Sequence, residues 1–239
     1  ASSSEELIMA EKKEMNVVLI RHTLSPEELI SLGARLCYSK STISGLSERI
    51  SAQDQTGFIN RLINMGHESI FEHASFTFGI EGVSRVLLAQ LTRHRLASFD
   101  VQSQRYVKLD NPELVLPASI RKSELSADAI NCMLTSMDMY RKLLDAGVPA
   151  EDARYVTPQA VPTELVMTMN ARELLHFFSL RTCNRAQWEI REMADRMLQK
   201  CREVSPEIFG QAGPGCVAGR CPEKRPCGHP RSCEEWDPE

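Results

Sequence analysis

The segment RHRLASFDVQSQRY, residues 93–106, carries the most informative pattern in this chain. Three arginines and a histidine lie here against one acid, Asp100, although the 239 residues carry a formal net charge of −4. Guanidinium groups are planar, permanently charged and able to bind phosphate by forked hydrogen bonds. Ser103 and Arg105 would share one side of an extended segment. The pattern predicts a site for a phosphorylated ligand; a solvated helix end is the alternative, because cations stabilise helix C-termini.

Hydrophobic periodicity on either side of this segment predicts a mixture of helices and strands. Alternating apolar residues predict a strand at 74–78, and short apolar runs predict strands at 17–20 and 164–169. Helical spacing and capping residues predict helices at 29–38, 51–65, 83–91, 125–146, 186–204 and from 171 onward. We therefore expect an α+β fold, with a central, largely antiparallel sheet flanked by helices.

The composition suggests one domain between two appendages. No internal repeat or long linker interrupts residues 16–210, which we interpret as a single mixed domain. Residues 1–15 are interpreted as an N-terminal extension, and residues 211–239 as a tail rich in Cys, Pro and Gly. Such a tail has too few apolar residues to build a core of its own.

Charge and hydropathy narrow the classes of partner. A net charge of −4 and a pI near 5.9 argue against general affinity for nucleic acid or an anionic membrane. No apolar run approaches the roughly 20 residues that span a bilayer, and the first residues lack the pattern of a signal peptide. We expect a cytoplasmic protein with no nucleic-acid or membrane partner.

The spacing of Arg93-His94-Arg95, seven residues and then Ser103 resembles the signature of the flavin-dependent thymidylate synthases. Five further blocks resemble family blocks in family order: ARLCYS (34–39), GHESIFEH (66–73), EDARYVTP (151–158), NAREL (170–174) and LRTCNRAQWEI (180–190). The resemblance covers about residues 16–210. It implies methylation of dUMP to dTMP, with methylene-tetrahydrofolate as carbon donor, FAD as hydride carrier and NADPH as reductant. It also implies a homotetramer with shared active sites.

The resemblance assigns roles to individual residues. Arg181 and Ser103 match catalytic positions, and the residues that match the dUMP site are Gln90, Arg95, Ser103, Arg105, Arg154 and Arg181. Those that match the FAD site are His67, Glu68, Ser69, Glu72, Arg93, His94, Asn170, Arg172 and His176. The chain has no G-x-G-x-x-G, so arginines, histidines and backbone amides would replace the usual dinucleotide loop. Each histidine alone has a structural interpretation as well.

Two positions depart from the family pattern. Asp100-Val101 stands where the family often has Asn-Glu, so Asp100 either replaces that carboxylate or balances nearby arginines. Asn184-Arg185 stands where the family often has His, and the extra cation could alter folate or ribose contacts.

The cysteines suggest no catalytic nucleophile. Cys183 lies near Arg181, but the family needs no thiol there. Tail residues Cys216, Cys221, Cys227 and Cys233, with His229, lack paired C-x-x-C spacing, so zinc, disulfides and disorder stay open, and no metal is assigned to the active site. A non-catalytic nucleotide- or RNA-binding protein with a zinc-like tail is the rival function, although aromatics are only 6%.

Overall fold

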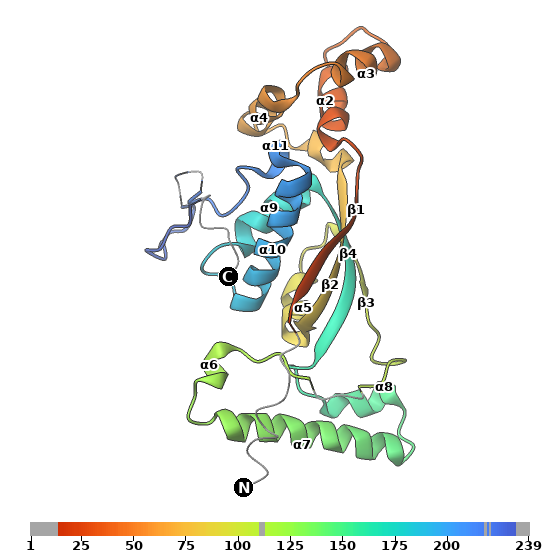
Figure 1. Cartoon of the computed structure of the whole chain (residues 1–239), viewed down its shortest axis with the longest axis vertical. Helices are drawn as coiled ribbons and strands as arrows, with labels where there is room; N and C mark the ends of the chain where they lie inside the picture. The colour runs from red at the N-terminus through yellow and green to blue at the C-terminus, as the bar shows by residue number, and fades with distance from the viewer. Residues whose placement is uncertain (1–13, 110–112, 218, 220, 233–239) are drawn as a thin grey trace. The chain divides into compact units, whose positions relative to one another are not determined.

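The computed structural model describes residues 14–109, 113–217, 219 and 221–232, so most of the predicted N-terminal extension lies outside the described residues. Four strands within these ranges form one antiparallel sheet in the order β1-β2-β4-β3 (Figure 1). Their bounds are β1 Asn16–His22, β2 Ser75–Ser84, β3 Ala97–Val101 and β4 Pro162–Asn170. The predicted α+β class with an antiparallel sheet is confirmed. Strand β3 was not predicted, because it is short and lies among the charged residues of the 93–106 segment.

The chain divides into two compact units, which are described separately. Unit 1 contains Ile80–Arg93 and Phe99–Val166, and unit 2 contains Val17–Gly79, His94–Ser98 and the described residues from Met167 onward. One domain over residues 16–210 therefore stays a prediction. Within the described ranges, none of the helices combines the length and apolar character that crossing a bilayer requires.

Unit 2 contains most of the helices. Their bounds are α2 Pro26–Leu36, α3 Ile43–Ser51, α4 Thr56–Asn64, the 3-10 helix η1 Ser69–His73, α9 Ala171–Arg181, α10 Trp188–Val204 and α11 Pro206–Phe209. The long helix predicted at 51–65 was wrong at its start. A separate helix, α3, precedes it, because the Thr42 hydroxyl accepts a hydrogen bond from the Gly45 amide and so caps a segment that reads as a turn.

Aromatic side chains form the centre of the unit 2 core. The ring centroids of Phe76 and Phe209 lie 5.3 Å apart, and those of Phe178 and Phe209 lie 5.9 Å apart, both edge to face. These residues come from β2, α9 and α11, and all three are fully buried. The core therefore packs α9 against the strand, and α9 carries Arg172, His176 and Arg181 of the candidate site.

Unit 1 has its own smaller core. Its helices are α5 Arg85–Leu91, α6 Ala118–Arg121, α7 Ser126–Asp145, α8 Ala150–Ala153 and the 3-10 helix η2 Arg154–Val156. Met137 and Tyr140 of α7 pack with Leu114, Ala153 and Val161. This confirms the long helix predicted at 125–146. The helix predicted from 83 begins two residues later, because Val83 is still part of β2 and Ser84 caps α5.

Candidate active site

Helix α9 begins where the sequence predicts it. Asn170 is its N-cap, and its side-chain oxygen accepts a hydrogen bond from the Glu173 amide at 2.9 Å. The cap directs the chain out of β4 and sets the register of the helix. Glu173 consequently points inward and is buried, whereas Arg172 and His176 lie on the exposed face, as their spacing of four predicts.

A largely buried row of three polar side chains joins α9 to His94: Glu173 and His94 are buried, and Arg181 is half-buried. Glu173 Oε1 lies 3.1 Å from His94 Nδ1, and Arg181 Nε donates to His94 Nε2 at 3.0 Å. A guanidinium has no acceptor, so the Nε2 atom must carry the lone pair. The proton is therefore on Nδ1, which donates to Glu173, and His94 is the neutral tautomer.

The surroundings of His94 favour this neutral form. Burial is the main cause that lowers its pKa; the hydrogen bond to Glu173 opposes the shift, and the charge of Arg181 adds to it. The Phe177 ring packs edge-on at 4.9 Å between centroids. A neutral imidazole thus connects a carboxylate to a guanidinium and orients Arg181. His94 and Arg181 were predicted as site residues from the sequence, whereas Glu173 was not.

A second cluster gathers several residues of the predicted flavin set. Arg172 on α9 donates through Nε to Glu68 Oε2 at 3.2 Å and through Nη1 to Glu72 on η1. Glu72 first and Glu68 second raise the pKa of Arg172 above its usual value. With two carboxylates for one guanidinium, the cluster has a net charge of −1. It is suited to accept hydrogen bonds and does not attract a pyrophosphate.

The other members of that set do not all lie at this cluster. His67 and Ser69 flank Glu68 in the chain, and the His176 ring lies 6.3 Å from that of His94. The Asn170 side-chain oxygen is occupied by the helix cap. Arg93 belongs to unit 1.

Unit 1 contains a cavity of about 700 Å³ lined by Arg85 and Arg154 together with Thr92, Gln104 and Thr157. No carboxylate is among its described lining residues. Burial first and the charge of Arg154 second lower the pKa of Arg85. Arg85 Nη1 is buried and has no hydrogen-bond partner within the described structure. Two cations that face a cavity with one unmatched donor describe an anion site.

Arg154 was predicted from the sequence as a dUMP-binding residue, whereas Arg85 was not. The available signal was a charged residue at a strand-to-helix junction, between the buried residues Val83 and Leu87. Gln90, in the last turn of α5, belongs to the same unit, whereas Arg95 and Arg181 of the predicted dUMP set belong to unit 2.

The expected extended conformation of Ser103 and Arg105 was wrong. The Ser103 carbonyl accepts from the Tyr106 and Val107 amides at 3.2 and 2.9 Å, so the segment forms a turn. Its hydroxyl accepts from the Arg105 amide at 3.3 Å, a local bond that stabilises the turn. The Arg105 side chain binds Glu151 at 2.8 Å on the exposed surface. A phosphate would have to compete with Glu151 for Arg105.

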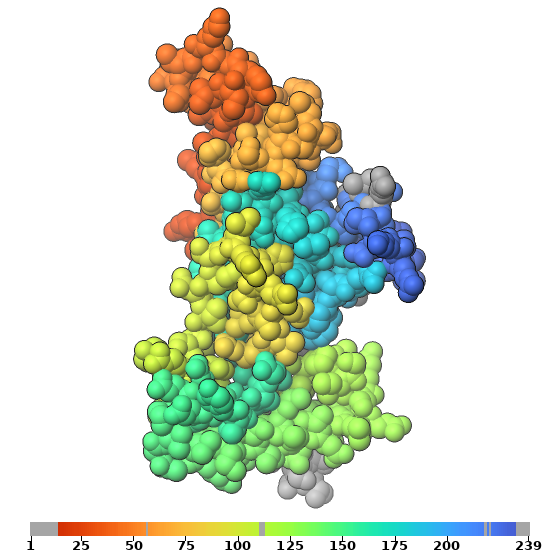
Figure 2. All heavy atoms as spheres, turned by 180° about the vertical axis from the view of Figure 1, so that it is seen from behind, coloured from red at the N-terminus to blue at the C-terminus, as the bar shows by residue number. Residues whose placement is uncertain are grey.

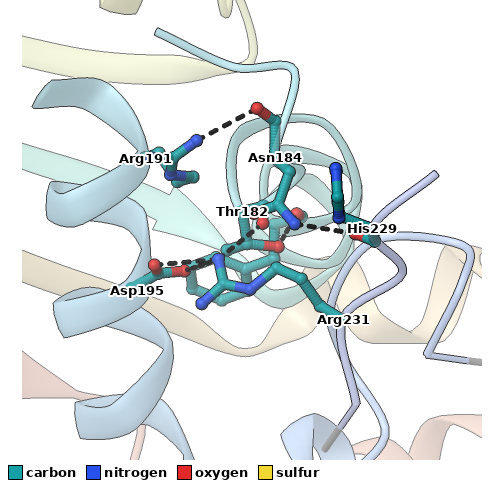
Figure 3. A network of polar contacts seen from close by, with 7 residues as sticks. Thr182, Asn184, Arg191, Asp195, His229 and Arg231 are labelled. Carbon is teal, nitrogen blue, oxygen red and sulfur yellow. Dashed lines mark hydrogen bonds and ion pairs between the residues drawn. The ribbon is translucent and has the colours of Figure 1, made fainter. Parts of the chain in front are cut away.

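The described tail is anchored to the loop that follows α9 (Figure 3). Arg231 Nη1 donates to the Thr182 carbonyl at 2.8 Å and to both oxygens of Asp195, at 3.0 and 2.9 Å. Asn184 donates to the His229 carbonyl at 2.8 Å. In Figure 2 the blue tail lies against the cyan α9–α10 region of the same unit. Arg185, one of the two departures, donates to the Arg225 carbonyl at 2.6 Å, so its extra cation serves the tail.

Among the described residues, these contacts hold the tail and no disulfide is formed. The seven cysteines of the described chain are free, and Cys233 lies outside the described residues. Within the same ranges, no group of three or more His, Cys, Asp or Glu residues is arranged to hold a metal ion.

Comparisons with known proteins show the family to which the chain belongs. The family model described as "Thymidylate synthase complementing protein" matches residues 18–207. A flavin-dependent thymidylate synthase of Geobacter sulfurreducens is 51% identical over 212 residues, which cover 87% of this chain and 91% of the relative. One from Pyrococcus furiosus is 44% identical over 220 residues, covering 88% and 90%.

A solved structure shares the fold. It is a UMP/dUMP methylase from Streptomyces cacaoi bound with 5-Br dUMP, with a TM-score of 0.71 and 25% identity, covering 83% of this chain and 94% of that one. The fold and the curated relatives thus place this protein among mixed α/β enzymes built like that methylase. The chain belongs to the flavin-dependent thymidylate synthase family, and this membership supports a flavin cofactor. The suggested resemblance is confirmed, and the alternative of a non-catalytic binding protein is wrong.

Proposed function

We propose that this protein methylates dUMP at C5 to give dTMP, with methylene-tetrahydrofolate as carbon donor, FAD as hydride carrier and NADPH as reductant. Family membership supports a flavin-linked thymidylate synthesis, and the related methylase was solved with a halogenated dUMP. The folate and the reductant follow from the family resemblance of the sequence blocks.

The cavity between Arg85 and Arg154 is the observation that carries this proposal. A phosphate monoester has close to two negative charges and several acceptor oxygens. One such oxygen would satisfy Arg85 Nη1, which is otherwise a buried donor without a partner. The cavity therefore suits the phosphate of a nucleotide better than an uncharged nucleoside.

The remaining residues of the substrate set have complementary tasks. Arg181, oriented by neutral His94, would stabilise the negative charge that develops on a uracil carbonyl. The Gln90 amide and the Ser103 hydroxyl would position the ring and the ribose by hydrogen bonds.

The flavin set fits FAD by its donor and acceptor chemistry. The carboxylates of Glu68 and Glu72 can accept hydrogen bonds from ribityl hydroxyls or a ring N–H, while His67, His176 and Arg93 can donate to acceptor atoms. The Asn170 side-chain NH₂ can still donate, because the cap uses only its oxygen. A bound flavin would supply hydride transfer, and these residues would hold and orient it.

No covalent nucleophile is part of this proposal. Cys183 is half-buried beside Arg181, yet polarisation of the pyrimidine replaces thiol attack. Cys183→Ala should therefore keep most of the dTMP-forming activity. A folded, flavin-loaded variant without activity would contradict the assignment.

We also propose a homotetramer with shared active sites. Val18 and Ile20, two residues apart on the edge strand β1, expose their side chains on one face. Light scattering coupled to gel filtration should give four chains per particle. A monomer with full activity would contradict the shared sites.

The direct test is dTMP formation by the purified, flavin-loaded protein. dUMP should be converted in the presence of NADPH and methylene-tetrahydrofolate, whereas deoxyuridine, which lacks the phosphate, should react at least about 100-fold more slowly. Arg154→Gln should raise the KM for dUMP and leave the flavin absorbance unchanged. Equal rates with nucleotide and nucleoside would contradict the phosphate assignment.

A further inference from the structure

A cavity of about 520 Å³ in unit 2, between α2, α3 and α4, has no role in the site described above. Its floor is apolar and includes Leu46, Ile50 and Leu62. Its rim carries Arg35, Arg49 and Arg61, and we call it the three-arginine pocket. It touches the proposed flavin set at His67 alone.

The charged residues that line the three-arginine pocket are all cationic. None of its described lining residues is acidic, although acids outnumber bases in the whole chain by 32 to 28. Three guanidinium groups around one cavity repel each other unless an anion is bound between them. An apolar floor under a cationic rim fits a ligand with an aromatic body and separate negative groups.

The Arg35 side chain stacks on an aromatic ring and lacks a hydrogen-bond partner. Its Cζ atom lies 4.3 Å from the centroid of Phe58, a cation–π contact that leaves the donor edge of the guanidinium unused. Its Nε atom is buried and unsatisfied within the described structure. A ligand atom that accepts a hydrogen bond from Arg35 Nε would therefore remove the free-energy cost of this unsatisfied buried donor.

Arg49 is held in place by neutral partners only. Its Nε donates to the Gly45 carbonyl at 3.0 Å and its Nη2 donates to the Ser41 hydroxyl at 2.6 Å. These bonds order the side chain but leave its charge uncompensated, so an anion would bind without having to order it first. Tyr38 is 84% exposed at the same cavity and offers an aromatic face at its mouth.

We propose that the three-arginine pocket binds the p-aminobenzoyl-glutamate half of the folate co-substrate. The benzoyl ring lies on the apolar floor beside Tyr38, the glutamate carboxylates bind the arginines, and the pteridine end extends past His67 toward the flavin set. This assignment rests on the proposed function. A chain of glutamates distributes its carboxylates along its length and so matches three separate arginines.

The pocket can be tested by binding and by kinetics. The first probes are p-aminobenzoyl-glutamate and its triglutamate form, titrated by calorimetry into the flavin-loaded protein. The variant Arg49→Gln/Arg61→Gln removes two charges while leaving Arg35 stacked on Phe58. Arg61→Lys keeps the charge, and Arg141→Gln, an exposed arginine of α7 paired with Asp138, is the control for loss of a surface cation.

The wild type should bind the triglutamate more tightly than the monoglutamate. The double variant should bind the triglutamate at least about tenfold more weakly and lose that preference, because two charge-assisted contacts are gone. Its KM for methylene-tetrahydrofolate should rise while its KM values for dUMP and NADPH stay unchanged. Arg61→Lys should retain most of the affinity, and Arg141→Gln all of it.

The failures of the two proposals are distinguishable. A wild type that forms dTMP and whose double variant binds both probes normally would overturn the pocket assignment alone. A rise in the KM for NADPH without a change for folate would overturn it in favour of a dinucleotide site. Arginine-dependent binding of the probes by a protein that forms no dTMP would support the pocket and contradict the proposed function.

Discussion

The His94–Glu173 contact in unit 2 and the Arg105–Glu151 pair in unit 1 each join a nitrogen donor to a carboxylate, but the first is buried and the second is exposed to water. His94 Nδ1 and Glu173 lie 3.1 Å apart with side chains only 5% and 8% exposed. Arg105 and Glu151 lie 2.8 Å apart, but their side chains are 53% and 46% exposed. The shorter contact is the weaker one, because water competes for both exposed partners and screens their charges.

The difference suits the two regions to different tasks. The buried row cannot exchange its partners without leaving a polar atom unsatisfied, so it keeps Arg181 in one orientation. The exposed pair loses little when it separates, so Arg105 can leave Glu151 for a phosphate. Solvent exposure thus distinguishes a region whose side chains keep their partners from one whose side chains can exchange them.

The largest effect is expected at the end of the buried row. Arg181→Gln should lower kcat/KM for dUMP by about 100- to 1,000-fold, since a preoriented charge at the pyrimidine is lost. The flavin absorbance after gel filtration should stay unchanged, because Arg181 is assigned to the substrate. Near-normal dTMP formation by this variant would contradict the conclusion that Arg181 is held in one orientation for the substrate.

Glu173→Ala should cost stability, because the buried His94 Nδ1–H loses its acceptor. We expect the free energy of unfolding to fall by about 2 to 3 kcal/mol. Urea denaturation followed by circular dichroism would measure the loss. The α9 cap should persist, because it uses the backbone amide of Glu173. A change below 0.5 kcal/mol, on the order of a surface substitution, would mean that the row is not held as described.

The contact between Arg231 and Asp195 anchors the tail, and its side chains are 13% and 16% exposed, between the values of the two pairs above. We therefore expect an intermediate loss of stability when it is removed. Arg231→Gln should lower the free energy of unfolding by about 1 to 2 kcal/mol, because Asp195 and the Thr182 carbonyl lose a charged donor. Arg225→Gln is the matched control, since Arg225 meets Arg185 through its backbone carbonyl. Equal melting temperatures for the two variants would contradict the anchor.

The lowered pKa of His94 predicts a pH dependence of stability. The folded state keeps His94 neutral, so the unfolded chain takes up the proton first as the pH falls below about 6.5. Stability is therefore lost as the pH falls from there toward the folded pKa, by at most about 1.4 kcal/mol per pH unit.

His94→Gln should remove this contribution. The measurement is the difference in unfolding free energy between wild type and variant at a series of pH values. Burial raises the pKa values of Glu27 and Asp195, so these carboxyls bind protons earlier in the folded state and stabilise it as the pH falls. The difference between the proteins isolates His94. A difference that does not change with pH would exclude a neutral His94.

The smallest effect is expected at the exposed pair. Glu151→Gln should change the unfolding free energy by less than about 1 kcal/mol, and raised salt should reduce the difference further. It should not weaken dUMP binding, because Arg105 is then free of its competitor. A loss comparable with that of Glu173→Ala would mean that exposure does not separate the two regions.

The accuracy of the sequence predictions depended on the kind of signal. The long amphipathic helices α7 and α10 were predicted well because their apolar spacing repeats over many turns. The short elements α3 and β3 were missed because a few residues with local polar character carry little periodicity. Tertiary contacts decide such segments: Leu46 and Ile50 become buried, and β3 pairs beside β4.

By itself, the sequence determined the α+β class, the family and the identity of the residues with reactive chemistry, because block spacing and hydrophobic period are properties of the chain. Only the tertiary structure decided how those residues are partnered. Glu173 reaches His94 over 79 positions, and Arg85 becomes an unmatched buried donor. Charge state, tautomer and solvent exposure depend on neighbours brought together by folding, and no local pattern in the chain encodes them.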